Sequence, residues 1–147
     1  MMSNNGTILL VEDSHDEVLL TTEALREQKI KNPIFVVSDG SEALEYLFCE
    51  GRYSDRDINQ KPSLVLLDLN LPKVGGVEVL RKIRKNPATQ CLIVVIFTTS
   101  NEQKDMIESY RLGVNSYLHK PIDFDDFNQV IKDIGMYWLL LNEHPYK

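Results

Sequence analysis

The chain has 147 residues, 43% of them hydrophobic and 26% charged, which suits one globular domain and is too short for two substantial ones. The net charge of −6, from 22 acidic and 16 basic residues, gives no general attraction to the phosphates of nucleic acids. No apolar stretch approaches the roughly 20 residues of a membrane span, and no basic region followed by an apolar one opens the chain, so we expect a cytoplasmic protein.

Short runs rich in Val, Ile and Leu alternate with longer segments of helical period, a pattern typical of repeated strand and helix units. The expected strands are, in chain order, residues 7–11, 33–37, 64–67, 91–97 and 116–119. The expected helices are residues 14–28, 41–49, 75–85, 101–112 and 123–141. Residues 1–6 are expected to be disordered, and residues 50–62, which are polar and have no period, to form a surface loop.

Five strands that alternate with five helices, joined by right-handed crossovers, predict a single α/β domain over residues 1–147. The expected architecture is a doubly wound five-stranded parallel sheet in the order 2-1-3-4-5, within a flavodoxin-like three-layer sandwich. At the start of the first helix, Ser14 and Glu17 have the spacing of a capping box, in which each side chain bonds the backbone N–H of the other residue.

Polar residues suited to phosphoryl chemistry follow four of the apolar runs. They are Glu12 and Asp13 after the first strand, Asp68 after the third, Thr98 after the fourth and Lys120 after the fifth. The carboxyl ends of neighbouring parallel strands meet at one rim of the sheet, where open α/β domains place their sites. The sequence therefore predicts one functional site built from four separate segments.

Three of these residues, Glu12, Asp13 and Asp68, would place three carboxylates close together, which is costly unless a cation neutralises them. Mg²⁺ is the expected ion because it prefers hard oxygen ligands. The backbone carbonyl of Asn70, just past Asp68, is a further candidate ligand. The predicted metal site thus consists of these four residues.

Asp68 is the expected nucleophile because it follows the most buried strand and lies between the other groups. The Thr98 hydroxyl and the mobile Lys120 cation, with the metal, could hold the oxygens of a phosphoryl group in transit to a carboxylate. Taken singly, each residue has a structural explanation: Asp13 or Ser14 as a helix cap, Thr98 as the cap of the fourth helix, Lys120 as a surface lysine. Their joint occurrence at four strand ends favours a functional site.

The histidines and cysteines show no site of their own. His15, His119 and His144 lack metal-ligand spacing and are expected on the surface or in loops. Cys49 and Cys91 are too few and too far apart for a disulfide framework. We expect both cysteines to be reduced, partly buried packing residues, with a redox role as the alternative.

The residues at the strand ends resemble, in order and approximate spacing, the receiver domain of response regulators, the CheY-like family. The resemblance covers nearly the whole chain and rests on Glu12-Asp13, on Asp68 within the segment Asp-Leu-Asn-Leu-Pro, on Thr98 and on Lys120-Pro121. It implies that Asp68 accepts a phosphoryl group from a sensor histidine kinase in a Mg²⁺-dependent reaction. It also implies a signalling protein that loses its phosphoryl group slowly, not a turnover enzyme.

The resemblance further implies how the site residues act. Asp13 and Asp68 would bind Mg²⁺, with Glu12 assisting through water, and Lys120 would pair with the phosphoryl group. The peptide bond between Lys120 and Pro121 is expected to be cis, which would aim Lys120 at the site.

A switch is also implied, in which Thr98 moves to contact the phosphoryl group and the aromatic Tyr117 follows it inward. More narrowly, the Asp-Leu-Asn-Leu-Pro segment, the long loop before residue 64 and the aromatic last helix resemble the small stand-alone regulators paired with cyanobacterial and bacterial phytochromes. A phytochrome-type kinase is therefore an expected partner, and a histidine phosphotransfer protein a second one. The segment Val74-Gly75-Gly76 departs from the family, where an acidic or polar residue commonly precedes the glycine.

The last helix carries more apolar residues than one buried face needs. Its expected core-facing stripe is Phe124, Phe127, Ile131, Ile134, Trp138 and Leu141. Off that stripe lie Val130, Met136, Tyr137, Leu139 and Leu140. This surplus suggests a homodimer through the fourth helix, the last strand and the last helix. The alternative is a helix end that simply folds over the sheet edge.

Two other classes of protein share parts of this pattern. A flavodoxin-like electron carrier would have the same fold, but the acids of Glu12-Asp13-Ser14-His15-Asp16 would repel a flavin phosphate where a hydroxyl- and Gly-rich loop is needed. A Mg²⁺-dependent phosphatase of the aspartyl-phosphate type also uses Asp, Thr or Ser, and Lys. Such enzymes usually carry a general-acid Asp two residues beyond the nucleophile, and here that residue is Asn70.

Overall fold

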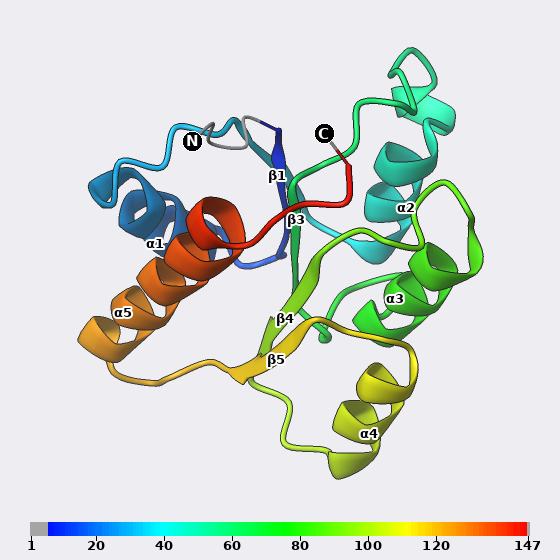
Figure 1. Cartoon of the computed structure of the whole chain (residues 1–147). Helices are drawn as coiled ribbons and strands as arrows, with labels where there is room; N and C mark the ends of the chain where they lie inside the picture. The colour runs from blue at the N-terminus through cyan, green and yellow to red at the C-terminus, as the bar shows by residue number, and fades with distance from the viewer. Residues whose placement is uncertain (1–5, 147) are drawn as a thin grey trace.

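The computed structural model describes residues 6–146, and its centre is a parallel sheet of five strands (Figure 1). The strand order is β2-β1-β3-β4-β5, and every neighbouring pair is parallel. The strands are β1 (Ile8–Val11), β2 (Ile34–Val37), β3 (Leu64–Leu67), β4 (Val94–Thr98) and β5 (Ser116–His119). The predicted order is confirmed.

Helices cover both faces of this sheet, with α1 and α5 on one side and α2, α3 and α4 on the other (Figure 1). The helices are α1 (His15–Glu27), α2 (Gly40–Phe48), α3 (Gly76–Lys85), α4 (Gln103–Arg111) and α5 (Phe124–Gly135). The three-layer α/β sandwich is therefore as predicted. The expected disordered start falls outside the described residues except for Gly6, whose carbonyl accepts a hydrogen bond from Asn32 at 2.7 Å.

Two apolar cores, one on each face of the sheet, explain why the strands lack polar alternation. Leu9 and Val11 of β1 pack with α2 and α3, whereas Ile8 and Leu10 pack with α1 and α5. β1 and β3 are buried along their whole length, as strands covered on both sides must be. Helices on both faces in turn leave the carboxyl rim as the edge where polar groups gather.

The register of the strands sets which residues share that rim. Val11 pairs with Leu67 across β1 and β3, and Leu67 pairs with Ile96 across β3 and β4. Ile96 in turn pairs with Tyr117 in β5. Residues that follow these pairs along each strand therefore emerge at the same edge.

At the end of the last helix, the residues that face the core differ from those predicted. After α5 the chain continues as a π-helix, η2 (Met136–Leu141), in which Asn142 N–H donates to the Tyr137 carbonyl five residues back, at 2.7 Å. Five-residue spacing places Leu139 in line with the buried Ile134, so Leu139 is only 2% exposed. The prediction that Leu139 lies off the core and Leu141 in it is wrong, since Leu141 is 64% exposed.

Smaller corrections concern isolated residues. Phe124, expected in the buried stripe, is 59% exposed because it lies at the first residue of α5, beyond the core. The loop over residues 50–62 includes a 3-10 helix, η1 (Gly51–Tyr53), whose Tyr53 ring packs edge-on against Tyr46. Both cysteines are free thiols as expected, but Cys91 is exposed and only Cys49 is partly buried.

The chain after η2 runs from the α5 side across to the opposite side of the sheet (Figure 1). There the Tyr146 hydroxyl accepts a hydrogen bond from Cys91 N–H at 3.3 Å. His144, expected on the surface or in a loop, lies in this irregular segment but is buried. Among the described residues, no helix combines the length and the apolar composition that crossing a membrane requires.

Candidate functional site: an acidic rim with a buried lysine

Three carboxylates gather where β1 and β3 end. One carboxylate oxygen from each of Glu12, Asp13 and Asp68 lies within 4.8 Å of the others, the only such acidic or metal-ligating group found among residues 6–146. Glu12 and Asp68 are buried, and Asp13 is exposed. Hard oxygen ligands at this separation fit a divalent cation such as Mg²⁺ or Mn²⁺.

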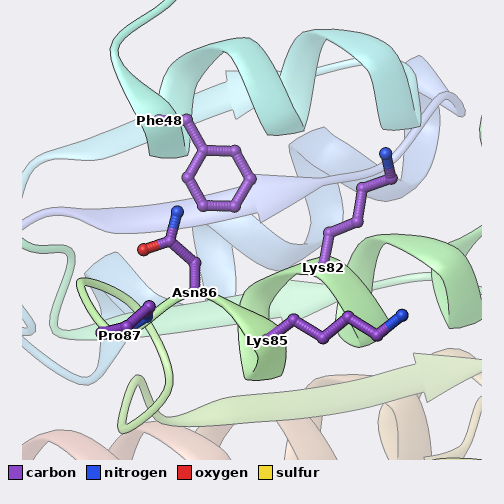
Figure 2. A pocket seen from close by; sticks show the side chains of 5 residues that line it. All are labelled: Phe48, Lys82, Lys85, Asn86 and Pro87. Atoms are coloured by element: carbon purple, nitrogen blue, oxygen red, sulfur yellow. The ribbon is translucent and has the colours of Figure 1, made fainter.

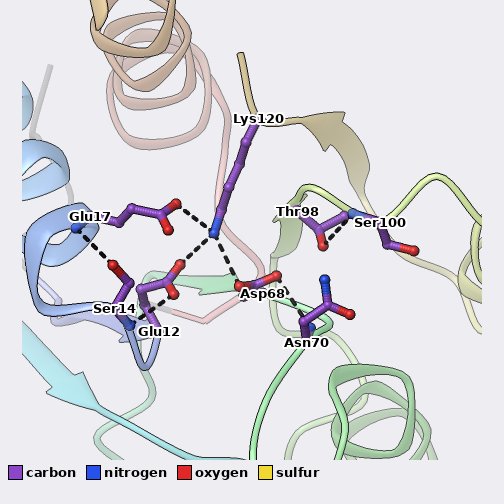
Figure 3. Close-up of polar contacts among 8 residues, drawn as sticks. All are labelled: Glu12, Ser14, Glu17, Asp68, Asn70, Thr98, Ser100 and Lys120. Atoms are coloured by element: carbon purple, nitrogen blue, oxygen red, sulfur yellow. Dashed lines mark hydrogen bonds and ion pairs between the residues drawn. The ribbon is translucent and has the colours of Figure 1, made fainter. Parts of the chain in front are cut away.

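The ammonium group of Lys120 is inserted between these carboxylates (Figure 3). Its Nζ lies 2.6 Å from Glu12 Oε1, 3.0 Å from Asp68 Oδ2 and 2.7 Å from Glu17 Oε1. Lys120 follows β5, and its backbone N–H donates to the Thr98 carbonyl at 2.8 Å, which fixes the start of the side chain beside β4. The side chain is 4% exposed, so it is held as a buried cation.

Burial and charge perturb the titration of both partners of the closest pair. Burial raises the pKa of Glu12 from 4.5 to about 7, and the hydrogen bond and charge of Lys120 oppose that rise. Burial by itself would lower the pKa of Lys120, but hydrogen bonds to Glu12 and Glu17 and the charge of Asp68 outweigh it and raise that pKa. Lys120 therefore stays a cation throughout the physiological range.

Asn70 and Thr98 lie next to this cluster without forming its ion pairs. The Asn70 backbone N–H donates to Asp68 Oδ1 at 3.3 Å, which orients the Asp68 carboxylate. Thr98 is fully buried, and its hydroxyl oxygen accepts the Ser100 N–H at 3.2 Å (Figure 3). The Thr98 hydroxyl is thus turned toward the loop after β4, one strand away from Asp68.

Tyr117 is partly buried in β5 and packs against the core under α2 and α3. Burial raises the pKa of its hydroxyl, which makes no hydrogen bond of normal length. The side chain already points inward in this structure.

The expected cis bond before Pro121 is wrong, because no peptide bond within residues 6–146 is cis. A trans bond is the lower-energy isomer, and Lys120 reaches the carboxylates with it.

The glycines after Asp68 have a packing role. A Cβ atom on Gly76 would lie 2.4 Å from the Asp68 carbonyl oxygen, so only glycine allows α3 to begin this close to Asp68. A Cβ on Gly40 would lie 1.9 Å from the Val74 carbonyl oxygen. The loop that departs from the family pattern is therefore fixed by close backbone contacts with the start of α2.

Sequence reasoning missed the role of Glu17. The capping box forms only in part: the Ser14 hydroxyl accepts the Glu17 N–H at 3.4 Å, but the Ser14 N–H donates to Glu12 Oε2 at 3.1 Å. The Glu17 carboxylate turns to Lys120 instead. The lysine is over a hundred residues away, so no local spacing could have shown this contact.

A hollow lies apart from this rim, between the carboxyl ends of α2 and α3 (Figure 2). It has a volume of about 380 Å³ and is lined by Phe48, Lys82, Lys85, Asn86 and Pro87. The lining includes two lysines and no carboxylate. It therefore offers no acceptor for phosphoryl chemistry.

Comparison with known proteins agrees with this geometry. The profile of the response regulator receiver domain matches residues 8–132. The chain belongs to this family. Response regulator Rcp1 from Synechocystis sp. is 40% identical over 132 residues, which cover 90% of this chain and 88% of that protein.

Solved receiver structures superpose closely on the whole sandwich. The crystal structure of the Mn²⁺-bound form of Rcp1 has a TM-score of 0.89 and 38% identity, covering 95% of this chain and 99% of that one. The phosphorylated cyanobacterial phytochrome response regulator RcpA has a TM-score of 0.90 and 37% identity, covering 97% and 99%. The chain is thus a two-component response regulator of the receiver type, similar to phytochrome response regulators.

Proposed function

We propose that Asp68 is the phosphoryl acceptor of this response regulator. Glu12 and Asp68 are both buried and both pair with Lys120, at 2.6 and 3.0 Å. Only Asp68 follows the central strand β3, between the acids after β1 on one side and Thr98 and Lys120 at the ends of β4 and β5 on the other. In the reaction an Asp68 oxygen attacks the phosphorus of a phosphohistidine, the bond from phosphorus to the imidazole nitrogen breaks, and its electron pair remains on that nitrogen. The observation that carries the proposal is this placement of Asp68 between acids and lysine.

The residues that would hold Mg²⁺ are Asp13 and Asp68, with Glu12 assisting through water and the Asn70 carbonyl as a further ligand. The donor set fits, because three carboxylates within 4.8 Å of one another outnumber the single ammonium of Lys120. When bound, the ion neutralises charge on the phosphoryl oxygens. The exposed Asp13 leaves the cluster open to solvent on one side, from which an ion can enter.

Lys120 and Thr98 would contact the phosphoryl group once it is on Asp68. Lys120 already lies within hydrogen-bond distance of the acceptor oxygen. Thr98 must release the Ser100 N–H and turn toward Asp68, a local rearrangement of the loop after β4. Tyr117, whose buried hydroxyl makes no normal hydrogen bond, would report that change on the α4 side of the sheet as the second residue of the switch.

The surface next to this switch supports a partner interface. On α4, Met106, Ile107 and Tyr110 are 43%, 44% and 56% exposed, and Ile122 before α5 is fully exposed. These apolar side chains favour the homodimer through α4, β5 and α5. Sedimentation that finds only monomer at micromolar concentration, with and without phosphorylation, would exclude it.

The expected phosphoryl donor is a sensor histidine kinase of the phytochrome type, given the likeness to phytochrome response regulators. A histidine phosphotransfer protein is the second expected partner, to which Asp68 would return the group. A cytoplasmic location stays a prediction from the sequence. The two alternative classes are disfavoured by the site: acids occupy the flavin-phosphate position, and Asn70 replaces the general-acid Asp of a phosphatase.

The direct test is incubation with Mg²⁺ and acetyl phosphate, followed by intact mass analysis. We expect one added phosphoryl group, stable in acid and labile in base, that is absent in Asp68→Asn. Asp57→Asn, an exposed aspartate in the loop before β3, is a matched control that should be modified like the wild type. An unmodified wild-type protein, or continuous hydrolysis of a phosphate ester, would overturn the proposal.

A further inference from the structure

The ammonium group of Lys120 has no donor left for a new ligand. A lysine has three N–H donors, and three carboxylate oxygens surround this one, from Glu12, Glu17 and Asp68 at 2.6, 2.7 and 3.0 Å. A phosphoryl group arriving on Asp68 must therefore displace one of these acceptors before it can pair with Lys120.

Glu17 differs from the other two acceptors. Glu12 and Asp68 belong to the acidic cluster that can hold a cation, whereas Glu17 does not. Figure 3 shows Glu17 reaching Lys120 from α1, on the side of the nitrogen away from Asp68. A cation held at the cluster would balance the charge of Glu12, Asp13 and Asp68, but Glu17 is not part of that set.

The local structure of α1 explains why Glu17 is available for this contact. In a complete capping box its carboxylate would accept the Ser14 N–H, but Glu12 takes that proton donor at 3.1 Å. The Ser14 hydroxyl still accepts the Glu17 N–H, so the backbone at residue 17 remains fixed. The side chain is 31% exposed, and its Oε1 lies 2.7 Å from Lys120 Nζ.

We propose that Glu17 is a positioning residue that competes with the phosphoryl group for Lys120 and so restrains the phosphorylated state of Asp68. The inference rests on the function proposed above. Four carboxylates, from Glu12, Asp13, Glu17 and Asp68, face one ammonium. Even with a divalent cation, one negative charge is left uncompensated before the anionic phosphoryl group arrives. Replacing Glu17 by glutamine removes that charge and weakens the hold on one donor of Lys120, and replacing it by alanine frees that donor.

The test compares Glu17→Gln with Asp16→Asn, which makes the same charge change in the same helical turn at an exposed residue. Beryllofluoride, a mimic of the phosphoryl group, is titrated calorimetrically at saturating Mg²⁺, and Mn²⁺ alone is titrated in a parallel series. We expect Glu17→Gln to bind beryllofluoride about three- to tenfold more tightly and Mn²⁺ about twofold more weakly. Asp16→Asn should leave both affinities at the wild-type values.

Opposite shifts for the anion and the cation are a signature that a purely structural role of Glu17 cannot produce. Glu17→Ala, which removes the acceptor altogether, should tighten beryllofluoride at least as much as the glutamine variant, and circular dichroism checks that α1 is intact. Two results would overturn the role of Glu17 and leave the proposed function standing. One is equal affinity for beryllofluoride in Glu17→Gln and Asp16→Asn, and the other is weaker beryllofluoride binding in both Glu17 variants. A wild-type protein that binds no beryllofluoride with Mg²⁺ would overturn the proposed function itself.

Discussion

The Glu12 carboxyl should dominate the pH dependence of stability when no metal is bound. Burial raises its pKa from 4.5 to about 7, even though Lys120 opposes the rise. A raised pKa means that the folded protein holds this proton more tightly than the unfolded chain does. The resulting stabilisation is fully present below pH 4.5, declines as the pH rises, and is lost above about pH 7.

The size of the effect follows from the shift. Each pKa unit corresponds to about 1.4 kcal/mol, so the shift from 4.5 to about 7 corresponds to about 3 kcal/mol. In urea denaturation with a chelator, we expect the free energy of unfolding of the wild type to fall by that amount between about pH 4.5 and 8, relative to Glu12→Gln. The glutamine keeps the shape of Glu12 and cannot titrate. Parallel pH profiles for the two proteins would refute the reasoning.

Adding Mg²⁺ should oppose this decline in stability, because a bound ion favours the ionised form of Glu12 and the proton favours the neutral form. The stability gained from a fixed Mg²⁺ concentration should grow as the pH rises toward 7 and level off above it. In Glu12→Gln the gain should be smaller and nearly independent of pH over this range. A gain in the wild type that is constant from pH 5 to 8 would show that Glu12 is already ionised.

Two further predictions address the ion pairs and the π-helix. Lys120→Met removes the cation that pairs with three carboxylates and should destabilise the metal-free protein by about 3–5 kcal/mol. Mg²⁺ should restore part of this loss. Urea denaturation that shows no loss of stability would contradict the buried ion pairs. Leu139→Ala should cost about 2–5 kcal/mol because this side chain is 2% exposed, whereas Leu141→Ala, at 64% exposure, should cost less than about 1 kcal/mol. Equal losses in thermal or urea unfolding would show that η2 does not set the register of the last helix.

The sequence was sufficient to predict the sheet order and the residues that meet at its rim. Runs such as residues 64–67 are apolar throughout, and in an α/β fold such strands are parallel and end at one edge. The placement of Asp68 after β3 and of Lys120 after β5 at the same rim of the sheet follows from that rule. In the structure the two side chains form an ion pair, with Lys120 Nζ 3.0 Å from Asp68 Oδ2.

What could not be predicted depended on contacts between distant segments or on a local change of helix geometry. The Glu17 carboxylate pairs with Lys120, and the Ser14 N–H donates to Glu12 and not to Glu17. These contacts depend on the folded positions of Glu12 and Lys120, which the local capping pattern does not give. Leu139 enters the core because the helix widens to five-residue spacing after Gly135, and a periodicity of 3.6 cannot show that change.

The central claim is that Asp68 itself receives the phosphoryl group, and site mapping tests it most directly. After reaction with acetyl phosphate and Mg²⁺, borohydride reduction converts an aspartyl phosphate into homoserine, which peptide mass spectrometry can locate in the chain. We expect homoserine at position 68 and unmodified aspartate at position 13. Homoserine at Asp13, or at any position other than 68, would contradict it.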